Sequence, residues 1–408
     1  MTDRLTRIAS LVLAFGFFIS CSSLQPSTQQ TSATPDLSEN QIRQQLDSID
    51  KKLQTTKQSA KLLYRKGDLL TKLAQKQEDP TQRNPIYSKA QQSLSEANRL
   101  HQDTPEPNTE KVQQLLKITW SNEHNQGVQT LQQDSTHGEP DFERAAAHFN
   151  NATTIIPDSA ISYRLGAKAM YKNQQPQKAI QILEKARTTI DDVPVILLEQ
   201  LAFLYLESDQ TPKAVEVYEQ AESFSNKNLN LLHGLSNAYI SSGDHRKAVE
   251  LLKRLVEREP DNVIYGQSLA TEFYFLAEQK LGDITTNMRE GKAIESTDYS
   301  EADSLLAQAE AQFEQTLERN PNDQDLKLSF AQFYQNSASK YQKLLPFVKQ
   351  ESKTPIENNI KRYVRDSIPL LEQVVGQRPD EQRIWQNLYQ AYSFLGMEQK
   401  AQNAKSNL

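Results

Sequence analysis

A regular internal repeat constrains the fold of this chain more than any other feature of its sequence. Leu201, Leu235 and Leu269 recur at a constant spacing of about 34 residues, a length typical of helical repeats. Each is followed directly by a small residue (Ala202, Ser236, Ala270) and three positions later by an aromatic one (Tyr205, Tyr239, Phe273). Units that return in phase are typical of stacked repeats, because one unit alone cannot bury its apolar face. Only 12 of the 408 residues are glycine, which favours helices over structures that need many tight turns.

A second pattern follows the first within most units and indicates a second helix. It consists of a small residue, a large apolar residue four positions on, a small or apolar residue after three more, and proline after a further five. It recurs as Ala145, Phe149, Ala152, Pro157; as Ala248, Leu252, Leu255, Pro260; as Ala309, Phe313, Thr316, Pro321; and as Ser367, Leu371, Val374, Pro379, while the last unit carries Trp385, Leu388, Tyr392, Gly396 and Ala401. Small residues let two helices approach closely, and proline ends the second helix.

Together the two patterns resemble the tetratricopeptide repeat (TPR), a helix–turn–helix unit of this length. The resemblance implies an all-α fold, a TPR-type α–α superhelix (solenoid) of about eight helical hairpins between residues 60 and 408. The first two units, 60–104 and 109–157, are degenerate. No segment beyond the N-terminal signal alternates apolar and polar residues between turn residues as a strand does, so we expect no sheet.

Two units exceed the period. Leu269 and Phe330 lie further apart than one repeat, and so do Phe330 and Leu388, so insertions are expected near 282–299 and 345–360. The added residues keep a helical apolar spacing: Phe273, Leu276, Ala277 and Leu281 with Ala302, Leu305 and Leu306, then Tyr341, Leu344 and Leu345 with Ile360, Tyr363 and Val364. We therefore expect two long hairpins with polar tips at 285–298 and 349–358, projecting from one edge as partner-contacting arms. Ordinary loops are the alternative, since loops tolerate insertion.

The N-terminus has the pattern of an export signal. Arg4 and Arg7 precede an apolar run over residues 8–19, which is shorter than the roughly 20 residues that span a bilayer. The only cysteine of the chain, Cys21, ends this segment, so no disulfide can form within the chain. An ordinary secretory signal followed by a buried cysteine is one interpretation of this pattern.

The other interpretation is a lipid anchor. The sequence Phe-Ile-Ser-Cys at 18–21 resembles the lipobox of bacterial lipoproteins. The resemblance implies a lipoprotein signal peptide over 1–20 and lipidation of Cys21. Ser22, in place of the aspartate that marks inner-membrane retention in that family, implies the outer membrane. Residues 21–36 are rich in Ser, Gln, Thr and Pro and are expected to form a flexible tether.

Three segments are expected after the tether. Residues 37–79 open with Ser38 and Gln41, which have the spacing of a capping box, and carry an apolar stripe from Ile42 to Ala74. They are expected to form a long N-terminal helix, packed on the body or in a coiled coil, or a degenerate repeat start. Residues 80–158 are a degenerate TPR-like region, and 159–408 are the TPR solenoid with its insertions.

No set of residues has the spacing of a catalytic or metal site. The six histidines are scattered, and no pair lies one helical turn apart: His101, His124, His137, His148, His233 and His245. Ser337 and Lys340 match a Ser-x-x-Lys motif whose companion motifs are absent. Glu123 and His124, near Trp120, are interpreted as a polar helix face with Trp120 in the repeat interface. We expect no enzyme activity, metal or cofactor, and the net charge of −6 does not favour binding to nucleic acid.

In TPR proteins the first helix of each hairpin lines a concave groove that accepts peptides. The resemblance carries these groove positions over to twelve residues of this chain: Tyr163, Glu199, Phe203, His233, Asn237, Gln267, Thr271, Tyr274, Gln332, Gln335, Gln386 and Gln390. Chaperone adaptors clamp a C-terminal carboxylate with lysine, arginine and asparagine, and the basic residues of that set are missing here. A lining of amides and aromatic rings suits an extended neutral segment. A solvated face without a ligand is the alternative.

The expected function is that of a non-enzymatic TPR lipoprotein, anchored in the bacterial envelope through its N-terminal lipid and facing the periplasm from the outer membrane. It would act as a protein–protein interaction scaffold or adaptor in envelope assembly or secretion. Its partners would be other envelope proteins or extended peptide segments. The alternative is a surface or periplasmic lipoprotein that binds glycans or nutrients with TPR-like helices. Against this stands the presence of only two tryptophans, because sugar sites usually stack on tryptophan.

Overall fold

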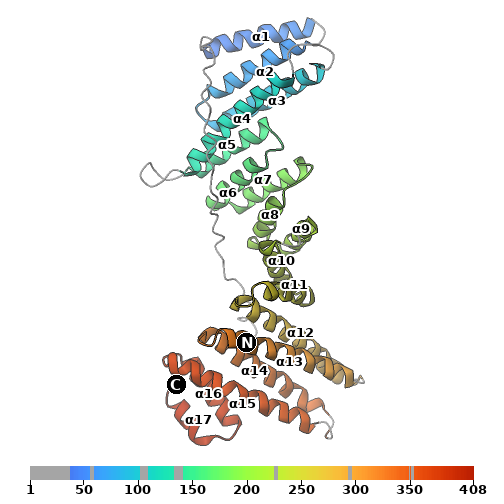
Figure 1. Ribbon diagram of the computed structural model, residues 1–408, viewed down its shortest axis with the longest axis vertical. Helices are drawn as coiled ribbons and strands as arrows, with labels where there is room; N and C mark the ends of the chain where they lie inside the picture. The colour runs from blue at the N-terminus through green and yellow to red at the C-terminus, as the bar shows by residue number, and fades with distance from the viewer. Residues whose placement is uncertain are drawn as a thin grey trace. The chain divides into compact units, whose positions relative to one another are not determined.

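The computed structural model describes residues 37–55, 59–101, 109–132, 141–224, 228–292, 296–348, 350 and 353–408. Within these ranges the chain forms 17 α-helices and no strand (Figure 1). A single helix, α1, is followed by eight hairpins, α2/α3 through α16/α17. The expected all-α repeat fold is confirmed. The signal peptide, Cys21 and the tether lie outside the described residues, and the described helices include none long and apolar enough to cross a membrane.

The chain divides into two compact units, residues 1–217 and 218–408. The first contains α1 (Glu39–Thr55), α2 (Ala60–Gln75), α3 (Pro80–His101), α4 (Thr109–Gln132), α5 (Phe142–Ile155), α6 (Ala160–Lys172), α7 (Pro176–Thr189) and α8 (Val195–Glu207). The division falls within α9 (Thr211–Phe224). The second contains α10 (Leu229–Ser242), α11 (His245–Arg258), α12 (Val263–Arg289), α13 (Ser296–Arg319), α14 (Gln324–Leu344), the short 3-10 helix η2 (Leu345–Phe347), α15 (Lys353–Gln377), α16 (Gln382–Phe394) and α17 (Glu398–Lys405).

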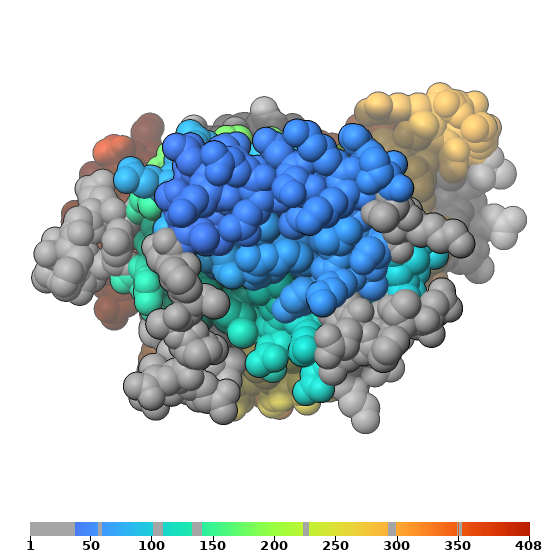
Figure 2. Space-filling view, turned by 90° about the horizontal axis from the view of Figure 1, so that it is seen from above, coloured from blue at the N-terminus to red at the C-terminus, as the bar shows by residue number. Residues whose placement is uncertain are grey.

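The N-terminal apolar stripe does not lie on one long helix. The capping box is confirmed, since Ser38 N–H donates to Gln41 Oε1 at 2.9 Å and Gln41 N–H to Ser38 Oγ at 3.3 Å. However, α1 ends at Thr55, and Ser59 caps a new helix, α2. The two halves of the stripe, represented by Ile42 and Leu70, then pack on each other in one apolar cluster. Folding back gives the stripe a partner within the chain, so the prediction of one long helix over residues 37–79 is wrong. Figure 2 views this end, with α1 and α2 in blue.

The residues that define the repeat period form the core of the hairpins. Leu201, Leu235 and Leu269 are at most 3% exposed, and the small residues that follow them are equally buried. The second-helix positions Ala248 and Leu252 are buried as well. Close approach is enforced at Gly234 of α10, where a Cβ atom would lie 2.5 Å from the ring of Tyr218.

A tyrosine–glutamate hydrogen bond joins several successive hairpins. The tyrosine belongs to the first helix of a hairpin, and the glutamate to the second helix of the hairpin before it. The pairs are Tyr205 with Glu184, Tyr239 with Glu219 and Tyr392 with Glu372, each at 2.6 Å, and Tyr334 with Glu310 at 2.9 Å. The aromatic position of the repeat therefore both fills the core and ties neighbouring hairpins together.

The two hairpins with insertions are long, as the sequence predicts. Helices α12 and α13 have 27 and 24 residues, and α14 and α15 have 21 and 25, whereas α10 and α11 have 14 each. The helices reach further than expected, since α12 continues to Arg289 and α15 begins at Lys353. The long hairpins also pack on each other, through Lys340 with Glu278, Tyr341 with Asp303, and Arg289 over the ring of Phe347. Each arm thus has one face covered by the other.

Candidate functional site

The buried polar cluster of the first unit is centred on Glu123 of α4, whose side chain is 1% exposed. One of its carboxylate oxygens accepts hydrogen bonds from Arg83 Nη1 and the Tyr87 hydroxyl, both at 2.9 Å. The other lies 2.8 Å from His148 Nδ1 and accepts from Asn151 Nδ2 at 3.1 Å. Burial alone would raise the pKa of Glu123, but the hydrogen bonds from His148, Asn151 and Arg83 outweigh it and hold this pKa below its ordinary value.

This geometry corrects the interpretation of Glu123 as part of a polar helix face. The carboxylate is buried, and both of its oxygens are already used by protein groups from α3 and α5. A catalytic carboxylate must be able to reach a substrate, and this one cannot. No cluster of His, Cys, Asp and Glu within the described ranges could hold a metal ion. The cluster around Glu123 therefore has a structural role, since it connects α3, α4 and α5 of the degenerate repeats.

Trp120 and His124 form a second joint, between α4 and α6. The Trp120 indole donates hydrogen bonds to the hydroxyls of Ser159 and Ser162 at 3.0 and 3.1 Å. His124 Nδ1 lies 3.0 Å from Ser162 Oγ, and its ring stacks on Trp120 with centroids 4.9 Å apart. The interpretation of Trp120 as an interface residue agrees with these contacts. Trp120 is half-buried and His124 covers one face of its ring, so that face is not available to stack on a sugar.

Helices α6 and α8, the first helices of two hairpins in the first unit, carry exposed apolar side chains. Ile161 and Tyr171 of α6 are 45% and 37% exposed, and Ile196 of α8 is 42% exposed. Phe203, two helical turns after Ile196, is half-buried, and its ring meets that of Tyr171 edge-on at 6.0 Å. The predicted groove residue Glu199 lies between Ile196 and Phe203 on the same stripe of α8. Large exposed apolar residues on neighbouring helices commonly mark an interaction site. We call this stripe, with its counterparts on the other first helices, the inner face.

In the second unit the corresponding stripe is mostly polar, although Ile264 of α12, at the position equivalent to Ile196, is 39% exposed. His233 Nε2 and Asn237 Nδ2 of α10 lie 3.1 Å apart. Gln267 of α12 donates to Ser329 of α14 at 3.0 Å, and the Thr271 hydroxyl donates to the Gln267 carbonyl at 2.8 Å. The amide positions predicted for the groove are thus partly buried and ordered by neighbouring polar groups.

The remaining predicted groove residues are four glutamines and two tyrosines. Gln332 and Gln335 of α14 are half-buried, and Gln386 and Gln390 of α16 are exposed. Two tyrosines are instead part of the core, and their assignment to an accessible groove is wrong: Tyr163 is 2% exposed and Tyr274 is 7% exposed.

Each of these tyrosines has a physical reason to be buried. On α6, Tyr163 is rotated by about 200° from the exposed Ile161, which turns it toward the core. The ring of Tyr274 is covered because α12 and α14 lie against each other, with Phe333 edge-on to it at 5.9 Å. Burial raises the pKa of the Tyr274 hydroxyl.

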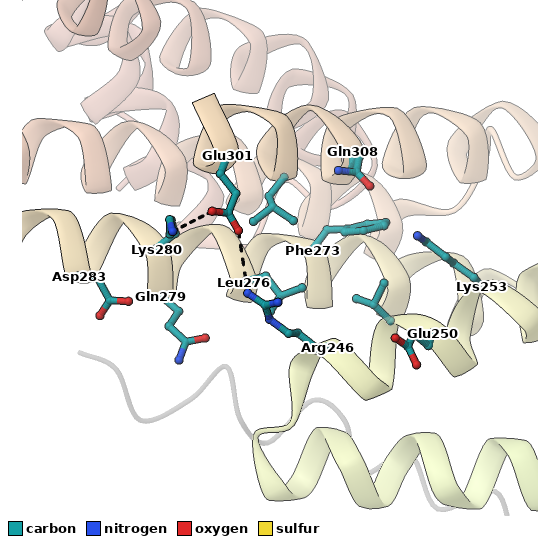
Figure 3. Close-up of a pocket in the computed structure, with 12 residues that line it drawn as sticks. Arg246, Glu250, Lys253, Phe273, Leu276, Gln279, Lys280, Asp283, Glu301 and Gln308 are labelled. Atoms are coloured by element: carbon teal, nitrogen blue, oxygen red, sulfur yellow. Dashed lines mark ion pairs between the residues drawn. The ribbon is translucent and has the colours of Figure 1, made fainter. Parts of the chain in front are cut away.

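A pocket that sequence reasoning did not predict lies in the second unit, where the short hairpin α10/α11 meets the long hairpin α12/α13 (Figure 3). Its volume is about 510 Å³. The floor is apolar and comes from one face of each of three helices: Val249 of α11, Phe273 and Leu276 of α12, and Leu305 of α13. The sequence identified Phe273, Leu276 and Leu305 only as residues that lengthen the helices.

Charged side chains surround this floor. Glu301 pairs with Lys280 at 2.7 Å and with Arg246 at 3.9 Å, as the dashed lines in Figure 3 show. The Lys253 ammonium lies 5.3 Å from the centre of the Phe273 ring. The acids Glu250 and Asp283 complete the rim. The pocket is thus an apolar strip between charged borders, and its wall contains no nucleophile paired with a base.

The stacked hairpins, with a small residue at each close approach, define a helical-repeat protein of the superhelical type. The tetratricopeptide repeat family model matches residues 205–272, within the segment where the repeat period is strictest. Residues 205–272 thus match tetratricopeptide repeats, as the sequence patterns predict for this segment. Stacked helical repeats form extended surfaces that can bind other molecules. No curated protein matches the sequence.

Several solved structures are similar to this chain at low identity. The MamA protein is 17% identical, with a TM-score of 0.37, over 50% of this chain and 92% of its own. The C-terminal part of a TPR protein from Cytophaga hutchinsonii is 14% identical, with a TM-score of 0.44, over 72% and 93%. YrrB, described as a TPR protein with an unusual peptide-binding site, is 15% identical, with a TM-score of 0.38, over 58% and 95%. These similarities do not define a ligand for this chain.

Proposed function

We propose that this chain is a non-enzymatic scaffold of the bacterial envelope that binds extended segments of other proteins along the inner face of its first helices. The observation that carries the proposal is the exposed stripe of Ile161, Tyr171 and Ile196 in the first unit. Solvent exposure of large apolar side chains on one face is unfavourable unless a partner covers them. The amide stripe of the second unit offers hydrogen-bonding groups to a peptide backbone.

The location is a separate part of the proposal and rests on the N-terminal sequence. The lipobox-like segment at 18–21 supports lipidation of Cys21, and Ser22 supports the outer membrane, with the repeats in the periplasm. The tether at residues 21–36 would then separate the repeats from the membrane surface. Glycan binding is less favoured, because His124 covers one face of the Trp120 ring and the Trp385 indole N–H is already used by the Pro379 carbonyl at 2.8 Å.

The test is chemical cross-linking in cells that express the chain or its Ile196→Glu variant. A carboxylate at this position should repel an apolar partner without disturbing the fold, because the side chain is already exposed. The matched control is Met397→Glu, since Met397 is 40% exposed and lies between α16 and α17, on no first helix. We expect Ile196→Glu, but not Met397→Glu, to lose the cross-linked envelope proteins. Identical cross-links in both variants would exclude this face as the binding surface.

A further inference from the structure

The pocket between α11, α12 and α13 exists because two neighbouring hairpins differ in length. Helix α12 has 27 residues against 14 in α10, and α13 has 24 against 14 in α11. At 1.5 Å per residue, α13 is about 15 Å longer than α11. Helix α11 therefore cannot cover the whole of α13. The other face of the arm is covered by the second arm, through Glu278 with Lys340 and Asp303 with Tyr341. One face of the first arm therefore lacks the helix that would normally pack there.

This surface is separate from the inner face of the proposed function. On α12, Thr271 belongs to the inner face. The side of α12 that lines the pocket carries Phe273, Lys280 and Asp283 instead. Thr271 and Phe273 are separated by a rotation of about 200° on an α-helix, so the two stripes point in nearly opposite directions. A segment bound at one stripe leaves the other accessible.

The chemistry of the surface specifies its occupant. The apolar floor contains Leu276 and Leu305, both only half-buried. Of the three cations on the rim, Lys280 and Arg246 pair with Glu301, and the Lys253 ammonium lies over the Phe273 ring. Asp283 and Glu250, at opposite sides of the pocket in Figure 3, form none of the close ion pairs found among the described residues. An apolar strip with a carboxylate near each end complements an amphipathic segment whose apolar residues are flanked by basic ones.

We propose that this pocket is a docking site for a short amphipathic helix of a partner protein, with an apolar ridge and basic residues at both ends. The helix takes the place that a longer α11 would occupy. Its ridge covers Leu276 and Leu305, and its basic side chains pair with Asp283 and Glu250. A helix suits the site better than an extended strand, because the three helices that line the pocket offer side-chain ridges and no free backbone edge.

The experiment uses the full chain with Cys21→Ser and Gln279→Cys, so that a single fluorophore reports from the pocket wall. The probes are three synthetic helical peptides of one length: a leucine ridge with lysine at both ends, the same ridge with glutamate at both ends, and a scrambled lysine peptide without a ridge. We expect the lysine-flanked peptide to bind about tenfold more tightly than the glutamate-flanked one. The scrambled peptide should not bind.

Two variants locate the binding. Asp283→Lys with Glu250→Lys should reverse the preference between the lysine-flanked and glutamate-flanked peptides. The matched control, Asp380→Lys, changes an exposed acid of the same unit outside the pocket and should leave the preference unchanged. Equal affinity for the lysine- and glutamate-flanked peptides, or a preference that the double variant does not reverse, would overturn the proposal. Ile196→Glu should not affect this binding, so failure here and failure of the inner-face scaffold are distinguishable.

Discussion

The Tyr239 hydroxyl donates a 2.6 Å hydrogen bond to Glu219, and this contact connects α10 to α9 of the preceding hairpin. Lys247 of α11 donates to the same carboxylate at 3.0 Å, and its ammonium lies 4.9 Å from the centre of the Tyr239 ring. The same arrangement of tyrosine, glutamate and lysine recurs in the last unit as Tyr392, Glu372 and Lys400. One set of three residues thus stabilises the stacking of hairpins at two distant places in the chain.

Tyr239→Phe is expected to lower the free energy of unfolding by about 1 kcal/mol, because it removes a hydrogen bond to a charged acceptor and keeps the packing of the ring. Denaturant unfolding followed by circular dichroism measures the change. Tyr389→Phe is the control, since Tyr389 lies partly exposed on α16. Equal effects of the two substitutions would show that the Tyr239–Glu219 contact does not stabilise the stack.

Glu123→Gln is expected to destabilise the first unit by roughly 3–5 kcal/mol, because the buried guanidinium of Arg83 loses its counter-charge. The loss should appear as an earlier unfolding transition of the helices around Arg83. Glu143→Gln on α5 is the control, since its side chain is 64% exposed. A Glu123→Gln protein as stable as the parent would mean that the buried charges are not needed to hold α3, α4 and α5 together.

The depressed pKa of Glu123 predicts an acid dependence of stability. A carboxyl group whose pKa is lower in the folded than in the unfolded protein contributes stability above its unfolded pKa, about 4.5, and loses it as the pH falls through the folded value. Stability should therefore decrease from about pH 5 downward. In Glu123→Gln this part of the decrease should be missing. Parallel pH profiles for the parent and the variant would contradict a charged Glu123 in the folded protein.

Cys21→Ser is expected to prevent lipidation and to release the protein from the membrane fraction. The thiol is the only group in the lipobox-like segment at 18–21 that can carry the lipid, and serine keeps the size of the side chain. Mass spectrometry and membrane fractionation of both forms measure the outcome. A Cys21→Ser protein with unchanged processing that still sediments with membranes would exclude this anchor.

The repeat architecture was predictable because it depends on local periodicity. The pattern of Leu201, Ala202 and Tyr205 returns from Leu235 and from Leu269, and burial of these residues requires only that successive hairpins stack. The long helices α12 to α15 were predictable for the same reason, since residues such as Leu281 and Ala302 continue the apolar spacing of a helix through the insertions.

Contacts between residues distant in the sequence were not predictable in the same way. Glu123 is far along the chain from both Arg83 and His148, and no local pattern shows that all three meet in a buried cluster. The stripe from Ile42 to Ala74 fits a single helix equally well, and the turn is determined by the packing of Ile42 against residues such as Leu70.

The sequence by itself determined the all-helical fold class, the repeat length and the two long hairpins, because these follow from the order of apolar and polar residues along one helix. Only the tertiary structure decided which of those residues stay accessible. Ile196 is exposed, while Tyr163 and Tyr274 are buried. The residue type alone does not decide this, because isoleucine and tyrosine occur both in cores and on surfaces. The pocket over Leu276 likewise arises from the difference in length between neighbouring hairpins, a property of how helices pack and not of any single segment.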